Sequence, residues 1–167
     1  MAYTVSSYAG AQPIANTETT QKHPLGTRVR GVDPTYGEGD FIYLLGVAST
    51  EVGFVVKYNA TTYQTALITV SNGKNKGVPV GIAMSANVAS QYGWYQVAGN
   101  AVVKKTTVAV TPGVPIFISG TTGRIKVLAA AGQQILGAQT ANLATIVTTT
   151  STVVVTLVAP FTQGQIT

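Results

Sequence analysis

The run Thr152-Val153-Val154-Val155-Thr156-Leu157-Val158 gives the clearest indication of the fold. Strands favour β-branched and aromatic residues, and this run contains almost nothing else. Residues 41–48 form a second apolar run of the same character. Both runs are much shorter than the roughly 18 apolar residues that a membrane-spanning helix needs. We therefore predict that both are buried strands and that the protein does not enter a membrane.

Further short β-rich runs lie between these two, with turn residues separating them. They are residues 53–58, 65–70, 78–84, 94–98, 101–107, 114–119, 124–128 and 135–139. Many short strands at close spacing indicate a barrel or a sandwich. We predict an all-β fold, a small β-barrel or sandwich of about ten short strands, over residues 41–167.

Three turn signals divide the later runs. Gly99-Asn100 separates two runs by two residues, which predicts a tight hairpin with Val97 opposite Val102. Pro112-Gly113 suits the central positions of a type II turn. Residues 119–123 are expected to close another hairpin.

Residues 1–40 show no sustained hydrophobic period and are rich in polar residues, glycine and proline. Pro13, Pro24 and Pro34 disfavour both a helix and a central strand. A long structureless stretch is unusual inside a compact domain. We therefore predict an extended N-terminal arm that lies on a neighbouring molecule.

The first eight residues carry neither a basic region nor an apolar core, so we expect no secretory signal and synthesis in the cytoplasm.

Charge is scarce and unevenly divided. Charged residues make up 9% of the chain, against about 25% in a typical soluble domain. All five acidic residues precede Val52, whereas seven of the ten basic residues follow it. Low charge fits a chain that spends most of its life docked in an assembly, because a free monomer depends more on charge for solubility.

The residues needed for catalysis are almost absent. The chain has no cysteine and one histidine, His23, which has no acidic neighbour within four positions. It contains neither a Walker-type phosphate loop nor a Gly-x-Ser-x-Gly motif. We predict no enzyme, no catalytic or metal-binding residue and no cofactor. The acidic turn at residues 33–40 alternates oxygen ligands with glycine, and whether it binds a cation is left open.

A basic patch is the main signal for a charged partner. It would combine the later cations with a group of aromatic residues, namely Lys74, Lys76, Lys104, Lys105, Arg124 and Lys126 with Tyr92, Trp94 and Tyr95. No run contains more than two basic residues, and a strong phosphate binder normally carries more. Nucleic acid is therefore the minor alternative, and a negatively charged protein surface would attract the same patch.

The last two thirds of the chain resemble the capsid decoration, or head cement, proteins of tailed bacteriophages. The matching motifs, in order, are Gly39-Asp40-Phe41-Ile42-Tyr43-Leu44-Leu45-Gly46-Val47, Val78-Pro79-Val80-Gly81-Ile82-Ala83-Met84-Ser85, Gln91-Tyr92-Gly93-Trp94-Tyr95-Gln96-Val97-Ala98-Gly99, Val114-Pro115-Ile116-Phe117-Ile118-Ser119, Gly123-Arg124-Ile125, Ile135-Leu136-Gly137-Ala138-Gln139-Thr140 and Val153-Val154-Val155-Thr156-Leu157. Each motif alone is common in β proteins, so the resemblance rests on their order.

The resemblance implies a structural virion protein on the capsid exterior that stabilises contacts between major capsid subunits. Its partners would be the major capsid protein and other copies of itself, as a homotrimer or, alternatively, a dimer. The capsid-contact candidates in the arm and the basic loop are His23, Arg28, Arg30, Tyr36, Lys74 and Lys76. The alternative is a receptor- or glycan-binding module of a fibre or spike, in which exposed rings would stack on sugars. The candidate rings are Tyr36, Tyr58, Tyr63, Tyr92 and Trp94.

Overall fold

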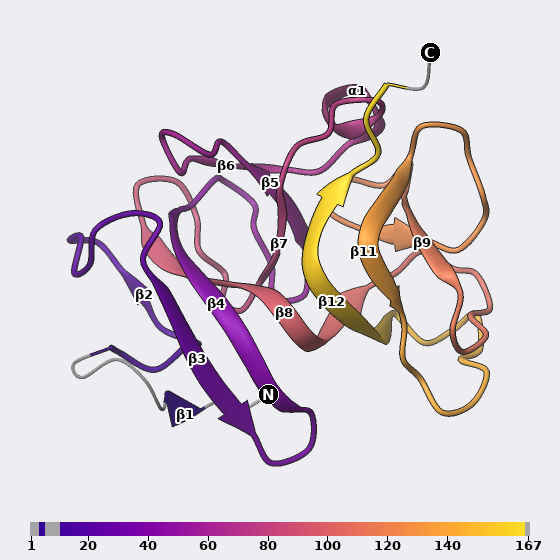
Figure 1. The fold of residues 1–167 in the computed structure, drawn as a ribbon, viewed down its shortest axis with the longest axis horizontal. Coiled ribbons are helices and arrows are strands. Elements are labelled where there is room, and N and C mark those ends of the chain that lie inside the picture. The colour runs from indigo at the N-terminus through magenta and orange to yellow at the C-terminus, as the bar shows by residue number, and fades with distance from the viewer. Residues whose placement is uncertain (1–3, 6–10, 166–167) are drawn as a thin grey trace.

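A single curled antiparallel sheet dominates the protein (Figure 1). The computed structural model describes residues 4–5 and 11–165. The strands are β1 (Thr4–Val5), β2 (Thr17–Glu18), β3 (Arg28–Asp33), β4 (Gly37–Leu45), β5 (Val55–Tyr58), β6 (Thr65–Leu67), β7 (Val80–Ala83), β8 (Tyr92–Lys104), β9 (Pro115–Ile118), β10 (Ile125–Lys126), β11 (Gln134–Thr140) and β12 (Thr152–Thr162). The helix α1 spans Val70–Gly73. The predicted all-β class, a barrel or sandwich of short strands, is confirmed.

The strand β8 joins the two halves of the sheet. The main path runs β1-β3-β4-β8-β12-β11-β9-β10, and β5, β6 and β7 branch from it. The first part of β8 pairs with β4, from Tyr92 to Gly99, and its later part pairs with β12, from Ala98 to Lys104. In Figure 1 β8 crosses from the β3–β4 side to the β11–β12 side.

The predicted hairpin at Gly99-Asn100 is wrong, because β8 continues through both residues. Val97 and Val102 therefore lie on one strand, and Val102 faces Val154 of β12 instead. The chain bends here without reversing. Gly99 has a φ of 84°, and a Cβ on it would lie 2.2 Å from the Glu38 carbonyl oxygen. Glycine is needed at this position for close approach to β4.

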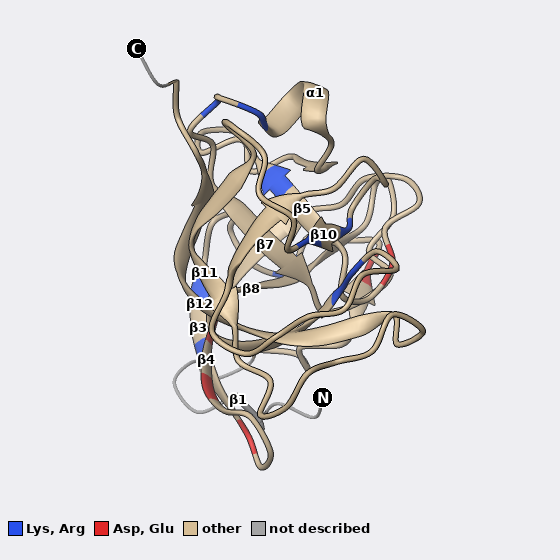
Figure 2. Ribbon diagram, turned by 90° about the vertical axis from the view of Figure 1, so that its right-hand side faces the viewer, with Lys and Arg blue, Asp and Glu red and all other residues tan. Residues whose placement is uncertain are grey.

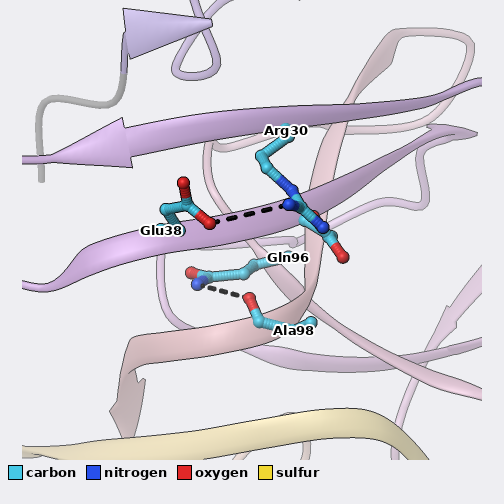
Figure 3. Close-up of polar contacts among 5 residues, drawn as sticks. Arg30, Glu38, Gln96 and Ala98 are labelled. Carbon is cyan, nitrogen blue, oxygen red and sulfur yellow. Dashed lines mark hydrogen bonds and ion pairs between the residues drawn. The ribbon is translucent and has the colours of Figure 1, made fainter. Parts of the chain in front are cut away.

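The Gln96 side chain holds the bend in β8. It is fully buried, and its Nε2 donates to the carbonyl oxygens of Ala98 and Asn100, each at 3.0 Å. These two carbonyls flank Gly99, so one amide group bridges the bend. Figure 3 shows the contact with Ala98. The two later turn predictions are confirmed. Gly113 has the positive φ, 69°, that a type II turn requires, and β9 pairs with β10 across residues 119–123.

The described residues form three apolar clusters around the sheet. The largest lies between β5, β7, the end of β8 and the strands β9 to β12. A second packs Ile42 and Leu44 of β4 against β5 and Tyr95 of β8. The third lies on the opposite face of β4, where Phe41 and Tyr43 pack with Trp94. The strand β4 is therefore buried on both faces, which explains its continuous apolar sequence.

The predicted extended arm over residues 1–40 is corrected by the structure. Residues 28–33 and 37–45 form a β3–β4 hairpin in the sheet. Residues 11–27 cover the third cluster, into which Ile14 is buried and against which Leu25 packs. Residues 1–3 and 6–10 of the predicted arm lie outside the described residues. Backbone pairing and apolar burial thus tie the described part of the first 40 residues to the same sheet.

Candidate functional site

Arg30 forms ion pairs with two carboxylates of the β3–β4 hairpin. Arg30 is exposed on β3, and its Nε lies 3.0 Å from Asp40 Oδ1. Its Nη1 lies 3.6 Å from Glu38 Oε2 (Figure 3). These carboxylates raise the pKa of the Arg30 guanidinium, through the hydrogen bond to Asp40 first. We call this region the hairpin end, defined by residues 30–40.

In the acidic turn within the hairpin end, a buried carboxylate stabilises the backbone. Asp33 is buried, and its Oδ1 accepts hydrogen bonds from the backbone N–H groups of Thr35, at 2.8 Å, and Tyr36, at 2.9 Å. Tyr36 itself is half-buried at the tip of the turn. In residues 4–5 and 11–165, no three His, Asp or Glu side chains lie close enough together to hold a metal ion. The carboxylates of the turn therefore bind groups of the hairpin itself, namely the turn backbone and the Arg30 guanidinium.

His23 lies in the core, where it cannot contact a partner directly. It was predicted as a contact candidate in a flexible segment, but only 9% of its surface is exposed. Its ring meets the Tyr43 ring edge-on at 5.2 Å and lies 5.5 Å from the Trp94 ring. Its Nε2 lies 2.6 Å from Gln12 Oε1. These contacts fasten residues 11–27 to the sheet.

The predicted basic patch does not form as one surface. Lys105 is 1% exposed, and its Nζ donates to the carbonyls of Val108, at 2.8 Å, Val147, at 3.2 Å, and Thr106, at 3.3 Å. Burial lowers the pKa of its ammonium group. Lys104 forms an ion pair with Glu51, and this contact lowers the pKa of the Glu51 carboxyl.

Apart from Tyr36 in the β3–β4 turn, the aromatic residues proposed for stacking on sugars or bases pack in the interior. Trp94 and Tyr95 are fully buried, and Tyr58 is 8% exposed. Tyr63 and Tyr92 are partly buried against the second and third clusters. Core packing therefore accounts for these rings, and the structure offers no aromatic platform among them.

Three of the cations that form no salt bridge among the described residues lie at the end of the molecule opposite the hairpin end. The connection from β6 through α1 to β7 carries Lys74 and Lys76, both exposed. Lys57 lies on β5, between β6 and β7, opposite Ala66 and Val80. We call Lys57, Lys74 and Lys76 the basic end. Figure 2 shows blue segments beside α1 and on β5, and red segments on the β3–β4 hairpin at the opposite end.

Local capping fixes the lysine-bearing connection. Thr69 caps α1: its Oγ1 accepts from the Asn72 backbone N–H, and Asn72 Oδ1 accepts from the Thr69 backbone N–H at 2.9 Å. The Asn72 Nδ2 also donates to the Leu67 carbonyl at 2.9 Å. Gly73 packs against Ile68 and Ile118, where a Cβ would collide with both side chains. These hydrogen bonds and contacts therefore fix the turn from which the Lys74 side chain projects.

A polar hollow of about 320 Å³ adjoins the basic end. Its lining consists of Lys57, Tyr58, Asn59, Thr62, Gln64, Thr65, Ala66 and Val78. Lys57 is the one charged residue in this lining, and no salt bridge among the described residues involves it. The basic end thus combines three ammonium groups that form no salt bridge within residues 4–5 and 11–165 with amide and hydroxyl groups, a combination that suits an acidic protein surface.

The structure divides the predicted contact candidates. Lys74 and Lys76 lie at the basic end, Arg30 and Tyr36 at the hairpin end, and His23 in the core. Arg28, at the start of β3, lines a separate hollow together with Tyr58 and Gly77. Sequence reasoning missed Lys57 as a contact candidate. Its signal was a single lysine within the otherwise apolar strand Phe54-Val55-Val56-Lys57-Tyr58, because an unpaired lysine is seldom fully buried.

Comparison with protein-family models, with curated proteins and with solved structures found no match to this chain. No helix in the described part of the chain is both long and apolar enough to cross a membrane. The resemblance to head cement proteins therefore stays a hypothesis, and the proposal below uses it together with the geometry.

Proposed function

We propose that this protein is a structural virion protein, a capsid decoration protein that binds the outside of a phage head through its basic end. The observation that carries the proposal is the separation of charge. The guanidinium of Arg30 is paired with carboxylates, whereas Lys57, Lys74 and Lys76 have no carboxylate partner among the described residues. The major capsid protein would supply the acidic surface.

The energetics favour many weak contacts over one strong site. A single exposed ion pair contributes about 0.2–1 kcal/mol. Three such pairs give a weak contact for one copy, but they steer encounter and fix orientation. Anchoring two or more copies of a linked assembly on one shell would raise the overall avidity without new contacts. A protein that binds only the assembled shell then stabilises it by mass action.

The basic end replaces the N-terminal arm as the expected source of specificity. Residues 11–27 cover Phe41, Tyr43 and Trp94 of their own chain. Releasing them to reach a neighbour would expose that apolar cluster to water. Each large side chain uncovered would cost about 1.5–3 kcal/mol. We therefore assign the described part of the arm a structural role.

The proposal is tested with heads of the virus that encodes the chain, prepared from a mutant that lacks it. Purified protein should co-sediment with these heads and raise the temperature at which they release DNA. Adding salt should weaken binding, because the contact is electrostatic. The absence of co-sedimentation at low salt would refute the proposal, and specific binding on a glycan array would favour the fibre or spike alternative.

A further inference from the structure

The hollow that Arg28 lines combines one cation with a mostly apolar wall. It has a volume of about 250 Å³ and lies where segments distant in the sequence meet. Arg28 comes from β3, Tyr58 from β5 and Val97 from β8. The rest of the lining comes from the segment that leads into β7 and from the end of β12, namely Gly77, Pro79, Val80, Ala159, Pro160 and Phe161. We call this site the Arg28 hollow.

Backbone hydrogen bonds hold the apolar wall in place. Pro79 and Phe161 form an antiparallel bridge, and the Tyr58 N–H donates to the Pro79 carbonyl at 3.1 Å. The Thr162 N–H donates to the Val78 carbonyl at 2.9 Å, and the Val78 N–H donates to Thr162 Oγ1 at 3.1 Å. The wall is therefore formed before a ligand arrives, and a preformed site loses less conformational freedom on binding.

A bulge at the end of β12 brings three successive residues to the Arg28 hollow. Side chains alternate between the two faces of a regular strand, yet Ala159, Pro160 and Phe161 all line this hollow. The pairing of β12 with β11 shifts register here, and Ala159 has a φ of 44°, which non-glycine residues seldom adopt. Phe161 stays 44% exposed at the hollow. Bulges re-aim side chains beside functional sites, so the hollow gives this one a role.

The Arg28 guanidinium has no carboxylate partner among the described residues. Arg28 is exposed, and none of the salt bridges there involves it. Asp40 shares a different hollow with Arg28, but its Oδ1 binds Arg30. Burial raises the pKa of the Tyr58 hydroxyl, and the positive charge of Arg28 nearby partly opposes this rise. A guanidinium and a hydroxyl group at the same hollow are donors that suit a carboxylate.

We propose that the Arg28 hollow binds an extended protein segment in which an acidic side chain stands next to an apolar one. The carboxylate meets the Arg28 guanidinium, whose planar set of N–H donors matches two carboxylate oxygens. The apolar side chain lies against Pro79 and Phe161. Sites for small-molecule ligands generally measure about 300–1,000 Å³, so this hollow better fits one side chain. Nucleic acid binding relies on several phosphate contacts, and this hollow holds one cation.

The Arg28 hollow borders the basic end. Tyr58 lines both this hollow and the one beside Lys57, and Gly77 directly follows Lys76 in the chain. The lysines attract any acidic surface at long range, whereas a hollow selects a side chain that fits it. The Arg28 hollow would therefore choose among acidic partners. This inference goes beyond the proposed function, because it does not require the partner to be a capsid protein.

Titration of the full chain with short defined peptides tests the proposal without heads. The probes are end-capped hexapeptides that place leucine or phenylalanine next to aspartate or glutamate, each paired with its asparagine or glutamine counterpart. At up to millimolar concentration, the acidic peptides should shift the backbone amide NMR signals of Gly77, Val80, Val97 and Ala159. The amide counterparts should bind at least tenfold more weakly, because a hydrogen bond between two charged groups is the stronger kind.

Arg28→Gln should weaken binding of the acidic peptides at least tenfold and remove their advantage over the amide counterparts. Lys22→Gln is the matched control, because Lys22 is exposed, lies outside the hollow and changes the net charge equally. It should leave peptide binding unchanged. Phe161→Glu is the second variant if Arg28→Gln does not fold. It places a carboxylate on the wall of the hollow while Arg28 stays, and it should weaken binding of the acidic peptides as strongly.

Three results would overturn the proposal: no acidic peptide binds, the amide counterparts bind equally well, or Lys22→Gln loses as much affinity as Arg28→Gln. An oligothymidylate that shifts the same signals and binds more tightly than every peptide would assign the hollow to nucleic acid instead. Because the titrations use no heads, their failure leaves the capsid proposal standing. A failure of head co-sedimentation likewise leaves peptide binding by the Arg28 hollow standing.

Discussion

The hairpin end and the basic end use their cations differently. Arg30 lies between two carboxylates, and Asp33 accepts hydrogen bonds from its own turn. Lys74 and Lys76 leave a capped turn that orients them, yet no carboxylate among the described residues pairs with them. Charge thus stabilises local structure at one end and remains available to a partner at the other.

This difference separates residues that the fold needs from residues that a partner needs. Paired side chains on a buried strand are expected to affect stability, whereas unpaired side chains on an exposed turn are expected to affect binding. The predictions below test this separation, beginning with the largest expected effect.

Deletion of residues 1–38 should abolish the fold. It removes β3 and the segment that covers Tyr43 and Trp94, both of which are fully buried. Uncovering two such side chains costs several kcal/mol, at about 1.5–3 kcal/mol each, which is comparable to a net stability of about 5–15 kcal/mol. Circular dichroism should show loss of the β signal. A folded deletion variant would restore the extended-arm interpretation.

Gly99→Ala should destabilise the protein by about 1–3 kcal/mol, because the left-handed backbone and the Glu38 carbonyl both oppose a Cβ. The strain arises where β8 approaches Glu38 of the hairpin end. The free energy of unfolding should therefore fall, while the protein that remains folded should bind heads as the wild type does. Urea unfolding measures the first quantity and head co-sedimentation the second. An unchanged unfolding midpoint would contradict the assigned bend in β8.

Replacing Lys57, Lys74 and Lys76 together by glutamine should weaken head binding by about 3- to 150-fold, since each lost ion pair costs about 0.2–1 kcal/mol. The unfolding free energy should change by less than about 0.5 kcal/mol for each replacement, because surface positions seldom matter more. Arg30→Gln is the matched control in the binding assay. Equal losses in the two variants would remove the distinction between the ends.

Arg30→Gln should have the smallest effect of the series, at most about 1 kcal/mol of stability. Its partners Asp40 and Glu38 are exposed, and exposed ion pairs contribute little. High salt should reduce even this difference between variant and wild type. A larger loss in urea unfolding would show that the ion pairs hold the β3–β4 register.

Sequence reasoning predicted the class and most of the later strands because those strands follow local rules. The run at residues 152–158 alternates Val153, Val155 and Leu157 toward the core, and Gly113 supplies the φ that its turn requires. The burial of Lys105 also follows a local rule, the alternation of side chains along a strand, which the sequence analysis did not apply to it. Two successive lysines on a strand point to opposite faces, so either Lys104 or Lys105 had to point inward.

The errors came from positions where tertiary contacts override local preference. Gly99-Asn100 has the composition of a hairpin turn, but Gln96 and the approach of β4 keep β8 extended there. The strand Arg28-Val29-Arg30-Gly31-Val32-Asp33 does alternate, with Val29 and Asp33 buried, yet its charges and nearby prolines concealed the pattern. The bulge at Ala159 left no mark in the sequence, because alanine rarely adopts a positive φ.

The most direct test of the central claim is a cryo-electron microscopy map of the head with this chain bound. Docking the fold into the decoration density should place α1 and the turn carrying Lys74 and Lys76 against the shell, with the β3–β4 hairpin directed away from it. A map with the hairpin end on the shell and the basic end in solvent, or with no density for the chain on the outer surface, would contradict the account.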